Sequence, residues 1–327
     1  MASVLIIILN WNCADDTIKA IESVYASHTE PDVYDIFLVD NGSKNEDVVK
    51  LREFFDRKGY DVLEINDTHT QIAEKGTKKI FYYQNPVNSG FTGGNNIGMK
   101  FALKNNYDYV FLLNADATVE KNTLRMLVEK CEGDKSIGVA GPKVYFFDFH
   151  GRKDIVSFGG GSVNFWKGHG FPEGGFPDNE REWQECQTDY IEGSVMLIRA
   201  KCLKDCGFFD ERFFAYWEDT DFCVRAKKHG YKVMFFPQII ARHRGSMGAY
   251  DFYYYSPHKI QLLNQNRLFF IQKNANWYHK LFFVFYFPYL FCAQIFLRAI
   301  HRRDMKYLKK ITLAVIKGFI GYVRLRG

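Results

Sequence analysis

The first half of the chain alternates unbroken apolar runs with segments of helical spacing, and this alternation constrains the fold more than any other feature. Residues 3–10 (SVLIIILN) predict a buried strand, and residues 15–27 then carry apolar side chains at helical spacing. The same order recurs, with strands expected at 35–43, 78–85 and 109–117, and helices at 45–59, 99–106 and 123–131. This order predicts βα units around a largely parallel, buried sheet. We therefore expect an α/β fold.

Three of the expected strands end in polar clusters, at residues 10–12 (NWN), 40–43 (DNGS) and 114–117 (NADA). The carboxyl ends of parallel strands line one rim of an open α/β sheet, where ligands bind, so these clusters should converge. The stretch 148–190 is rich in Gly, Pro and aromatic residues without clear periodicity. We expect it to form a long irregular insert over the site, followed by a short element at 194–200.

Composition narrows the class of protein. A chain of 327 residues can bury a full core and has the size of one large domain or two small ones. An aromatic content of 17% suggests surfaces for a sugar, a base or a membrane interface. Seven scattered cysteines without a CxxC pair favour reduced thiols in the cytoplasm over a disulfide framework or a zinc site. The first residues lack a basic n-region, so we expect a buried strand there and not a signal peptide.

The net charge of +5 is concentrated at the C-terminal end. Residues 298–327 hold nine Lys/Arg and one acid, a net +8, which leaves −3 for residues 1–297 and argues against a nucleic-acid-binding body. Residues 281–297 carry no charge but contain Pro288 and are short of the roughly 20 residues that a spanning helix needs. We expect an in-plane or re-entrant aromatic segment with the basic tail on anionic headgroups. The alternative is a soluble helical subdomain that buries its Phe and Tyr side chains against the catalytic body.

Residues 215–230 (AYWEDTDFCVRAKKHG) place three carboxylates, Glu218, Asp219 and Asp221, behind an aromatic run. Helix capping explains one of these acids well, or two at most. Asp221 and Arg225 also have the spacing of a structural i,i+4 pair. Glu218, beside Tyr216 and Trp217, remains unexplained, and carboxylates beside aromatic residues often mark functional sites.

Three further features bear on chemistry. Asp116 follows a strand, where a carboxylate can hold a divalent metal, although a turn Asp is the ordinary alternative. The Gly-rich loop at 88–98 opens a helix whose N–H groups could face phosphate or sugar hydroxyls, or it is simply a tight turn. It lacks the GxGxxG and GK[ST] patterns, which argues against a dinucleotide fold and a Walker ATPase. His243 follows an apolar strand and could add a nitrogen ligand to the same metal, although a lone His is usually structural.

Together, these motifs resemble those of a known family. The series VLIIILNWN, FLVDNGS, NPVNSGFTGGNNIG, YVFLLNADATV, GSVMLIRA, FFAYWEDTDFCVRAKKHGY and ARHRGS is similar to that of inverting, metal-dependent glycosyltransferases of family two, particularly the rhamnosyltransferase-like branch. The resemblance implies a GT-A catalytic domain over 1–250, with a mostly parallel central sheet flanked by helices. It leaves 251–327 as a helical, aromatic and basic membrane-associating region.

The resemblance also implies roles for individual residues. Asp219 matches the catalytic base, and Asp116 and His243 match ligands of a Mg²⁺ or Mn²⁺ ion. Donor contacts are implied for Leu9, Trp11, Asp40, Asn88, Gly90, Gly94, Asn95 and Asn114. Asn114 replaces the first acid of the family's DxD motif, so metal affinity would rest on Asp116, His243 and the diphosphate. Acceptor contacts are implied for Gly193, Tyr216, Trp217 and Glu218.

The expected function is inverting transfer of a sugar, with rhamnose suggested by the branch, from a nucleoside diphosphate sugar to a glycan. The tail favours a lipid-linked acceptor in cell-surface polysaccharide synthesis, and a peripheral or monotopic enzyme on the cytoplasmic face of the membrane. Two alternatives stay open: a UDP-hexose or UDP-N-acetylhexosamine donor in the same fold, or a non-catalytic glycan- or membrane-binding protein. Asp116, Asp219 and His243 together discriminate against the second, because a binding module needs neither a base nor metal ligands.

Overall fold

The computed structural model of the chain describes residues 2–27, 33–245, 256–302, 309–310, 312–313, 316–318 and 320. The predicted boundary between residues 250 and 251 lies outside these residues, as does most of the basic tail beyond residue 302.

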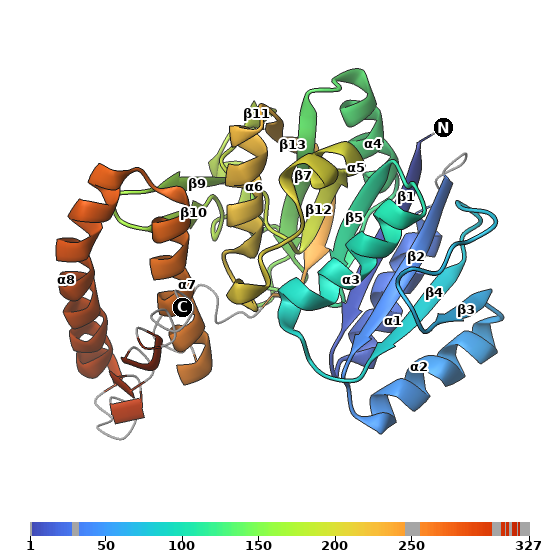
Figure 1. Cartoon of the computed structure of the whole chain (residues 1–327), viewed down its shortest axis with the longest axis horizontal. Coiled ribbons are helices and arrows are strands. Elements are labelled where there is room, and N and C mark those ends of the chain that lie inside the picture. Colours follow the sequence, from blue (N-terminus) through green and yellow to red (C-terminus); the bar gives the residue numbers. More distant parts are fainter. Residues whose placement is uncertain are drawn as a thin grey trace.

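A large central sheet with helices packed against it forms the body of the protein (Figure 1). Its first half consists of parallel strands: β1 (Ser3–Asn10), β2 (Val33–Asn41), β3 (Val62–Ile65), β4 (Ile80–Asn85) and β5 (Tyr109–Asn114). The helices of this half are α1 (Ala14–Ala26), α2 (Asn45–Lys58), α3 (Gly90–Lys104) and α4 (Thr123–Gly133). The predicted alternation of strands and helices is confirmed, apart from the short edge strand β3, which was not predicted.

The second half of the sheet is mixed. Its strands are β6 (Ala117–Val119), β7 (Ile137–Phe146), β8 (Val156–Phe158), β11 (Cys186–Gln187), β12 (Val195–Arg199) and β13 (Lys232–His243). The order along the sheet is β11-β13-β7-β12-β5-β1-β2-β4-β3. Strand β12 runs antiparallel to both neighbours, β5 and β7, because no crossover helix connects β7 to β12. The first half is therefore parallel as expected, and the second half combines the parallel pair of β7 and β13 with antiparallel pairs.

Two stretches expected to be irregular contain regular structure. Helix α3 begins at Gly90, so most of the predicted loop 86–98 is helical. Its glycines allow close packing on β1: a Cβ atom at Gly94 would lie 2.3 Å from Leu9 Cδ1. The insert 148–190 contains β8, β11, the hairpin of β9 (Gly161–Asn164) and β10 (His169–Pro172), and the 3-10 helix η1 (Asp178–Glu180).

The remaining helices lie over or beyond the half of the sheet that contains β12, β7 and β13 (Figure 1). They are α5 (Ala200–Cys206), η2 (Glu211–Phe213), α6 (Glu218–Lys228), α7 (Pro257–Asn274) and α8 (Trp277–Arg302). A second hydrophobic cluster joins the last three helices, and in it the rings of Trp217 and Phe270 lie 4.7 Å apart. Helix α7 therefore shares a core with α6.

Helix α8 contains Pro288 and has two different faces. Phe283 and Phe287 are buried in the cluster with α7, as the subdomain alternative expects. Other apolar side chains of α8 are exposed: Trp277, Tyr278, Leu281, Phe282, Val284, Phe285 and Tyr289. Over the described residues, none of the helices combines the length and hydropathy that crossing a membrane requires.

Candidate active site

The carboxyl ends of four strands meet along one rim of the sheet. Asn10 of β1 is paired in register with Asp40 of β2, and Leu9 is paired with Asn114 of β5. At the same rim His243, the last residue of β13, is paired with Ala117 of β6. This register confirms the predicted convergence of the three polar clusters, and it adds the end of β13.

Asp116 and His243 form a pair at this rim. His243 Nε2 lies 3.0 Å from Asp116 Oδ1 and 3.5 Å from Asn114 Nδ2. The backbone N–H of Arg244 donates to the carbonyl of Asp116 at 2.8 Å, which extends the β6–β13 pairing beyond His243. The fold thus brings together the two predicted metal ligands and the Asn that replaces the first acid of the motif.

The two partners shift each other's pKa in opposite directions. Burial alone would raise the pKa of Asp116, but the hydrogen bond and charge of His243, with the charge of Arg244, hold it below the ordinary value. Burial alone would lower the pKa of His243, but Asp116 and the charge of Glu192 raise it. The pair is therefore an ion pair over a wider pH range than isolated side chains would be.

The pair is suited to a divalent cation. The Asp116 side chain is 28% exposed and the His243 side chain 10% exposed. They offer a carboxylate oxygen and an imidazole nitrogen, which are ligands that Mn²⁺ accepts. Among the described residues, no group of three or more His, Cys, Asp or Glu side chains is arranged to hold a metal. A cation here would need further ligands from a bound molecule, and a diphosphate supplies such oxygens.

Asp219 lies in the first turn of α6. Its Oδ2 accepts the backbone N–H of Gly193 at 3.0 Å, and its Oδ1 accepts from the N–H and hydroxyl of Thr220 at 2.6 and 3.1 Å. Burial raises the pKa of Asp219, and these hydrogen bonds oppose the rise. The predicted base and Gly193, predicted to contact the acceptor, are thus in direct contact. A carboxylate with a raised pKa is well suited to accept a proton.

Two glutamates lie beside Asp219. Glu218 is buried, and its Oε2 has no hydrogen-bond partner among the described residues. Burial, with the nearby charges of Asp219 and Glu192, raises its pKa well above the ordinary value. Burial also raises the pKa of Glu192, whose charged neighbours include Asp116, Asp219 and His243. Sequence reasoning missed Glu192, although a Glu directly before the predicted contact Gly193 was a usable signal.

The donor-side residues form a buried polar network. Asp40 is fully buried and accepts from Asn10 Nδ2 at 2.9 Å. The same amide reaches Ser43 Oγ and Asp47 Oδ2, both at 3.1 Å. Asn10, Ser43 and Asp47 were not predicted as site residues, although Asn10 belongs to the polar cluster at the end of β1. Trp11, in contrast, is exposed.

The predicted donor residues of the Gly-rich stretch lie in and before α3. Asn88 Oδ1 accepts from Asn41 Nδ2 and from the N–H of Gly90. Gly90 has φ +77, and a Cβ there would lie 2.4 Å from the carbonyl oxygen of Phe214. Gly94 packs against Leu9 of β1, and Asn95 is buried and donates to the carbonyl of Phe91. The predicted contact of these two residues with the donor stays a prediction.

The two aromatic residues predicted to contact the acceptor differ in exposure. Tyr216 is exposed, and Lys259 Nζ lies 5.3 Å from its ring centroid. Trp217 is buried against Phe270 of α7. Stacking of Trp217 on an acceptor sugar therefore does not fit this structure, because packing between α6 and α7 already occupies the ring.

Family comparison identifies the chain. The family described as "Glycosyl transferase family 2" matches residues 5–205, more than half of the 327 residues. The chain belongs to glycosyltransferase family 2. The family described as "Glycosyl transferase family group 2" matches residues 185–316 of this glycosyltransferase, a range that includes α6, α7 and α8.

A curated relative is also a glycosyl-transferring enzyme by its name. The low-salt glycan biosynthesis hexosyltransferase Agl10 of Haloferax volcanii is 26% identical over 165 residues, which are 47% of this chain and 48% of the relative. This glycosyltransferase thus matches about half the length of that curated relative.

Solved structures share the fold. GalNAc-T7 with UDP, GalNAc and Mn²⁺ gives a TM-score of 0.58 at 16% identity, covering 80% of this chain and 51% of that one. Staphylococcus aureus TarS 1–349 with UDP-GlcNAc gives 0.57 at 13% identity, with 98% and 82% coverage. Mannosyltransferase PcManGT from Pyrobaculum calidifontis, with GDP-Man and Mn²⁺, gives 0.54 at 12% identity, with 98% and 86% coverage. The predicted GT-A fold is confirmed.

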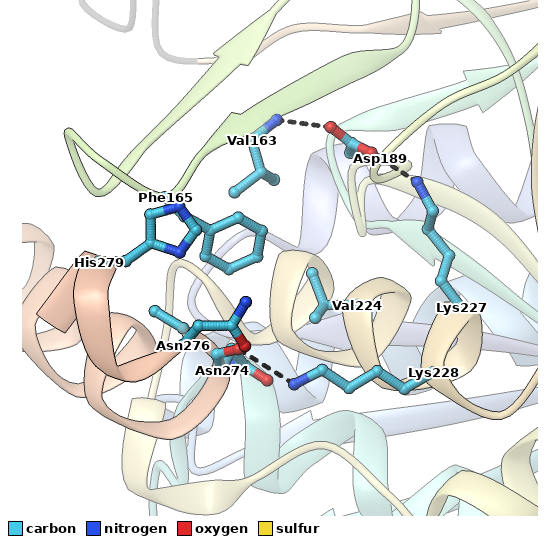
Figure 2. Close-up of a pocket in the computed structure, with 10 residues that line it drawn as sticks. Val163, Phe165, Asp189, Val224, Lys227, Lys228, Asn274, Asn276 and His279 are labelled. Carbon is cyan, nitrogen blue, oxygen red and sulfur yellow. Dashed lines mark hydrogen bonds and ion pairs between the residues drawn. The ribbon is translucent and has the colours of Figure 1, made fainter.

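This glycosyltransferase also has a hollow of about 330 Å³, and Figure 2 shows the residues that line it. It is lined by Val163, Phe165, Asp189, Val224, Lys227, Lys228, Asn274, Ala275, Asn276 and His279. Asp219 is in the first turn of α6, whereas Lys227 and Lys228 are in its last turn. At 1.5 Å per residue the two ends are roughly 12 Å apart along the helix axis. The hollow is therefore separate from the candidate site at the rim of the sheet.

Proposed function

We propose that the chain is an inverting glycosyltransferase that moves a sugar from a nucleoside diphosphate sugar to a hydroxyl of a glycan. One observation supports the proposal: the charges that shift the pKa of Glu192 include those of His243, Asp219 and Asp116, and Asp116 and His243 are themselves paired. Family membership and the solved relatives with bound UDP, UDP-GlcNAc or GDP-Man support the nucleotide-sugar donor.

Asp219 is the proposed base. The acceptor hydroxyl attacks the anomeric carbon from one face and gives its proton to Asp219 Oδ1 or Oδ2. The new carbon–oxygen bond forms as the bond to the diphosphate oxygen breaks on the opposite face, through an oxocarbenium-like state. The products are the inverted glycoside and the nucleoside diphosphate. The N–H groups of Gly193 and Thr220 keep the carboxylate oriented between turnovers.

Asp116 and His243 are the proposed metal ligands. A Mg²⁺ or Mn²⁺ ion bound there would neutralise the charge of the leaving diphosphate. Two of the solved relatives contain Mn²⁺, which supports this part of the proposal. His243 must lose its proton before it can bind a metal, so the Asp116–His243 ion pair competes with the cation.

We propose rhamnose as the donor sugar from the resemblance to the rhamnosyltransferase-like branch. The alternatives to be tested are a UDP-hexose and a UDP-N-acetylhexosamine. Turnover of dTDP-rhamnose, UDP-glucose, UDP-galactose and UDP-N-acetylglucosamine should be compared under identical conditions. A clear preference for one of the UDP-sugars would replace rhamnose without affecting the roles of Asp116, Asp219 and His243.

We further propose peripheral membrane contact through α8, at the cytoplasmic face, with a lipid-linked acceptor used in cell-surface polysaccharide synthesis. Trp277, Phe285 and Tyr289 are 75%, 74% and 69% exposed on this helix. A contiguous exposed apolar surface of this kind marks an interaction site, and Trp and Tyr prefer the membrane interface. The net +8 of residues 298–327 would add attraction to anionic headgroups.

The decisive experiment is the variant Asp219→Asn. Turnover should fall by about 10²–10⁴, the usual contribution of a positioned base, while donor affinity is unchanged. Asp205→Asn is the matched control, since Asp205 pairs with Lys201 on the surface. If Asp219→Asn turned over as fast as this control, the assignment of the base would be wrong. Absence of any turnover by the wild type would favour a non-catalytic glycan-binding protein.

A further inference from the structure

The segment 213–217, which leads into α6, has an unusual backbone conformation. Phe214, Tyr216 and Trp217 have φ values of 59°, 70° and 78°. Bulky residues other than Gly rarely adopt positive φ, and a run of them persists only when the surrounding structure enforces it. The segment ends at Trp217, the N-cap residue of α6, two residues before Asp219.

A single side chain of α7 holds most of this segment. Asn266 is fully buried, and its Nδ2 donates to the carbonyl oxygens of Phe213, Ala215 and Tyr216 at 2.7, 2.8 and 2.9 Å. The remaining carbonyl, that of Phe214, accepts the N–H of Thr92 at 3.1 Å. Four consecutive carbonyls are thus held in place, three of them by one amide group.

The oxygen of the same amide group makes no comparable contact. Asn266 Oδ1 is buried and has no hydrogen-bond partner among the described residues. An unpaired buried oxygen is unfavourable, so the hydrogen bonds that Nδ2 donates must stabilise the fold by more than the unpaired oxygen destabilises it. The opposite orientation of the amide would set its oxygen against three carbonyl oxygens, so the contacts themselves determine the assignment.

The segment also determines where α6 begins. The carbonyl of Trp217 accepts the N–H of Asp221 at 2.8 Å in the first turn. The rings of Phe213 and Trp217 pack on Phe269 and Phe270 of α7, at 4.9 and 4.7 Å. A change in the segment would therefore move the first turn of α6, which carries Asp219.

We propose that Asn266 is a positioning residue for the catalytic base. It holds the segment 213–217 in the conformation that has positive φ at Phe214, Tyr216 and Trp217, and so sets the location and desolvation of Asp219. This inference rests on the proposed role of Asp219. Without the amide, the three carbonyls would need other partners, and the segment would relax toward negative φ. Helix α7, which follows the predicted catalytic domain in sequence, is on this view part of the catalytic machinery.

The test compares two buried asparagines of α7. Asn266→Ala removes the whole amide, and Asn266→Asp keeps the shape but replaces the donors. Asn264→Ala and Asn264→Asp are the matched controls, because Asn264 is also buried but donates to Ile260 of its own helix. In the Asn266 variants kcat should fall at least tenfold, since a misplacement of the base by 1 Å can lower the rate by roughly 10²-fold. The KM for the donor should stay within about twofold of wild type. The Asn264 variants should keep their kcat.

A pH profile separates positioning from general stability. Burial raises the pKa of Asp219, so a loosened segment that admits water should shift the acidic limb of the kcat profile of Asn266→Ala to lower pH. A purely structural role would lower the melting temperature and leave that limb in place. Asn266 variants with the kcat and acidic limb of the Asn264 controls would overturn the inference. Full turnover by Asp219→Asn would instead refute the proposed base itself.

Discussion

Asp221→Asn should destabilise the protein markedly, because Asp221 is the fully buried acid that joins α6 to α7. Its Oδ2 accepts from Arg225 Nε and from Lys273 Nζ, both at 2.9 Å. Its Oδ1 accepts from Asn274 Nδ2 at 2.8 Å. The predicted Asp221–Arg225 pair is thus confirmed, and the structure adds two partners from α7. Asn at this position would leave two cations beside a neutral group.

The magnitude follows from the full burial of Asp221 and from the contacts that its two cationic partners keep. Removing one member of a buried ion pair typically lowers the free energy of unfolding by about 3–5 kcal/mol. Lys273 also contacts Asp210, and Arg225 donates to the carbonyl of Phe208, so both cations keep a partner. We therefore expect a loss of about 2–4 kcal/mol. With an unfolding entropy near 2.1 cal/mol/K per residue, 327 residues convert 3 kcal/mol into a decrease of roughly 4 °C in melting temperature.

Urea and thermal unfolding, followed by far-UV circular dichroism, measure this difference. Asp205→Asn is the control, because its pair with Lys201 leaves the two side chains 34% and 71% exposed, and its melting temperature should stay close to wild type. A melting temperature of Asp221→Asn that matches this control would refute the reasoning, since the buried network would then contribute no more than a surface pair.

Three further predictions concern pH, metal and membrane. The raised pKa of Glu218 means that the folded state holds this proton more tightly than the unfolded state. Wild-type stability should therefore fall as the pH rises from the ordinary pKa of Glu through the folded-state pKa of Glu218. Glu218→Gln should flatten a plot of melting temperature against pH, and an unchanged slope would contradict this. With a nucleoside diphosphate present, Asp116→Ala and His243→Ala should each weaken Mn²⁺ binding, measured by electron paramagnetic resonance, by at least tenfold; wild-type affinity in both would exclude the pair as ligands. Deletion of 277–327 should abolish flotation with anionic liposomes and leave a folded protein; collapse of the whole chain would favour the subdomain alternative.

Sequence patterns were reliable where structure is local. The apolar run of β1 and the helical spacing of α2 repeat every few residues, so each element is specified by its own segment. The family resemblance assigned roles to Asp116, His243 and Asp219, and the first two proved to be neighbours. Local patterns failed where packing overrides propensity: the glycines of α3 resemble a flexible loop until β1 is placed against them.

Other features of the site have no local signature. Trp217 precedes two acids in the sequence and was predicted to contact the acceptor, but in the structure its ring packs on Phe270 of α7. Glu192 stands directly before the predicted contact Gly193 in sequence, but its charged neighbours at the ends of β5 and β13 and in α6 are set by tertiary structure alone. Asn266 lies in an ordinary helical pattern, and nothing nearby in sequence indicates that its amide reaches back to Phe213.

The sequence by itself determined the α/β alternation, the polar strand ends and the residue types that the family chemistry requires. Only the tertiary structure decided which of them meet. Asp116 and His243 are 127 positions apart, and Asn266 is 53 positions from Phe213. The physical reason is that helices and strands arise from short-range periodicity, whereas contacts between them depend on how whole surfaces pack. Burial, partner charges and therefore pKa values exist only after that packing.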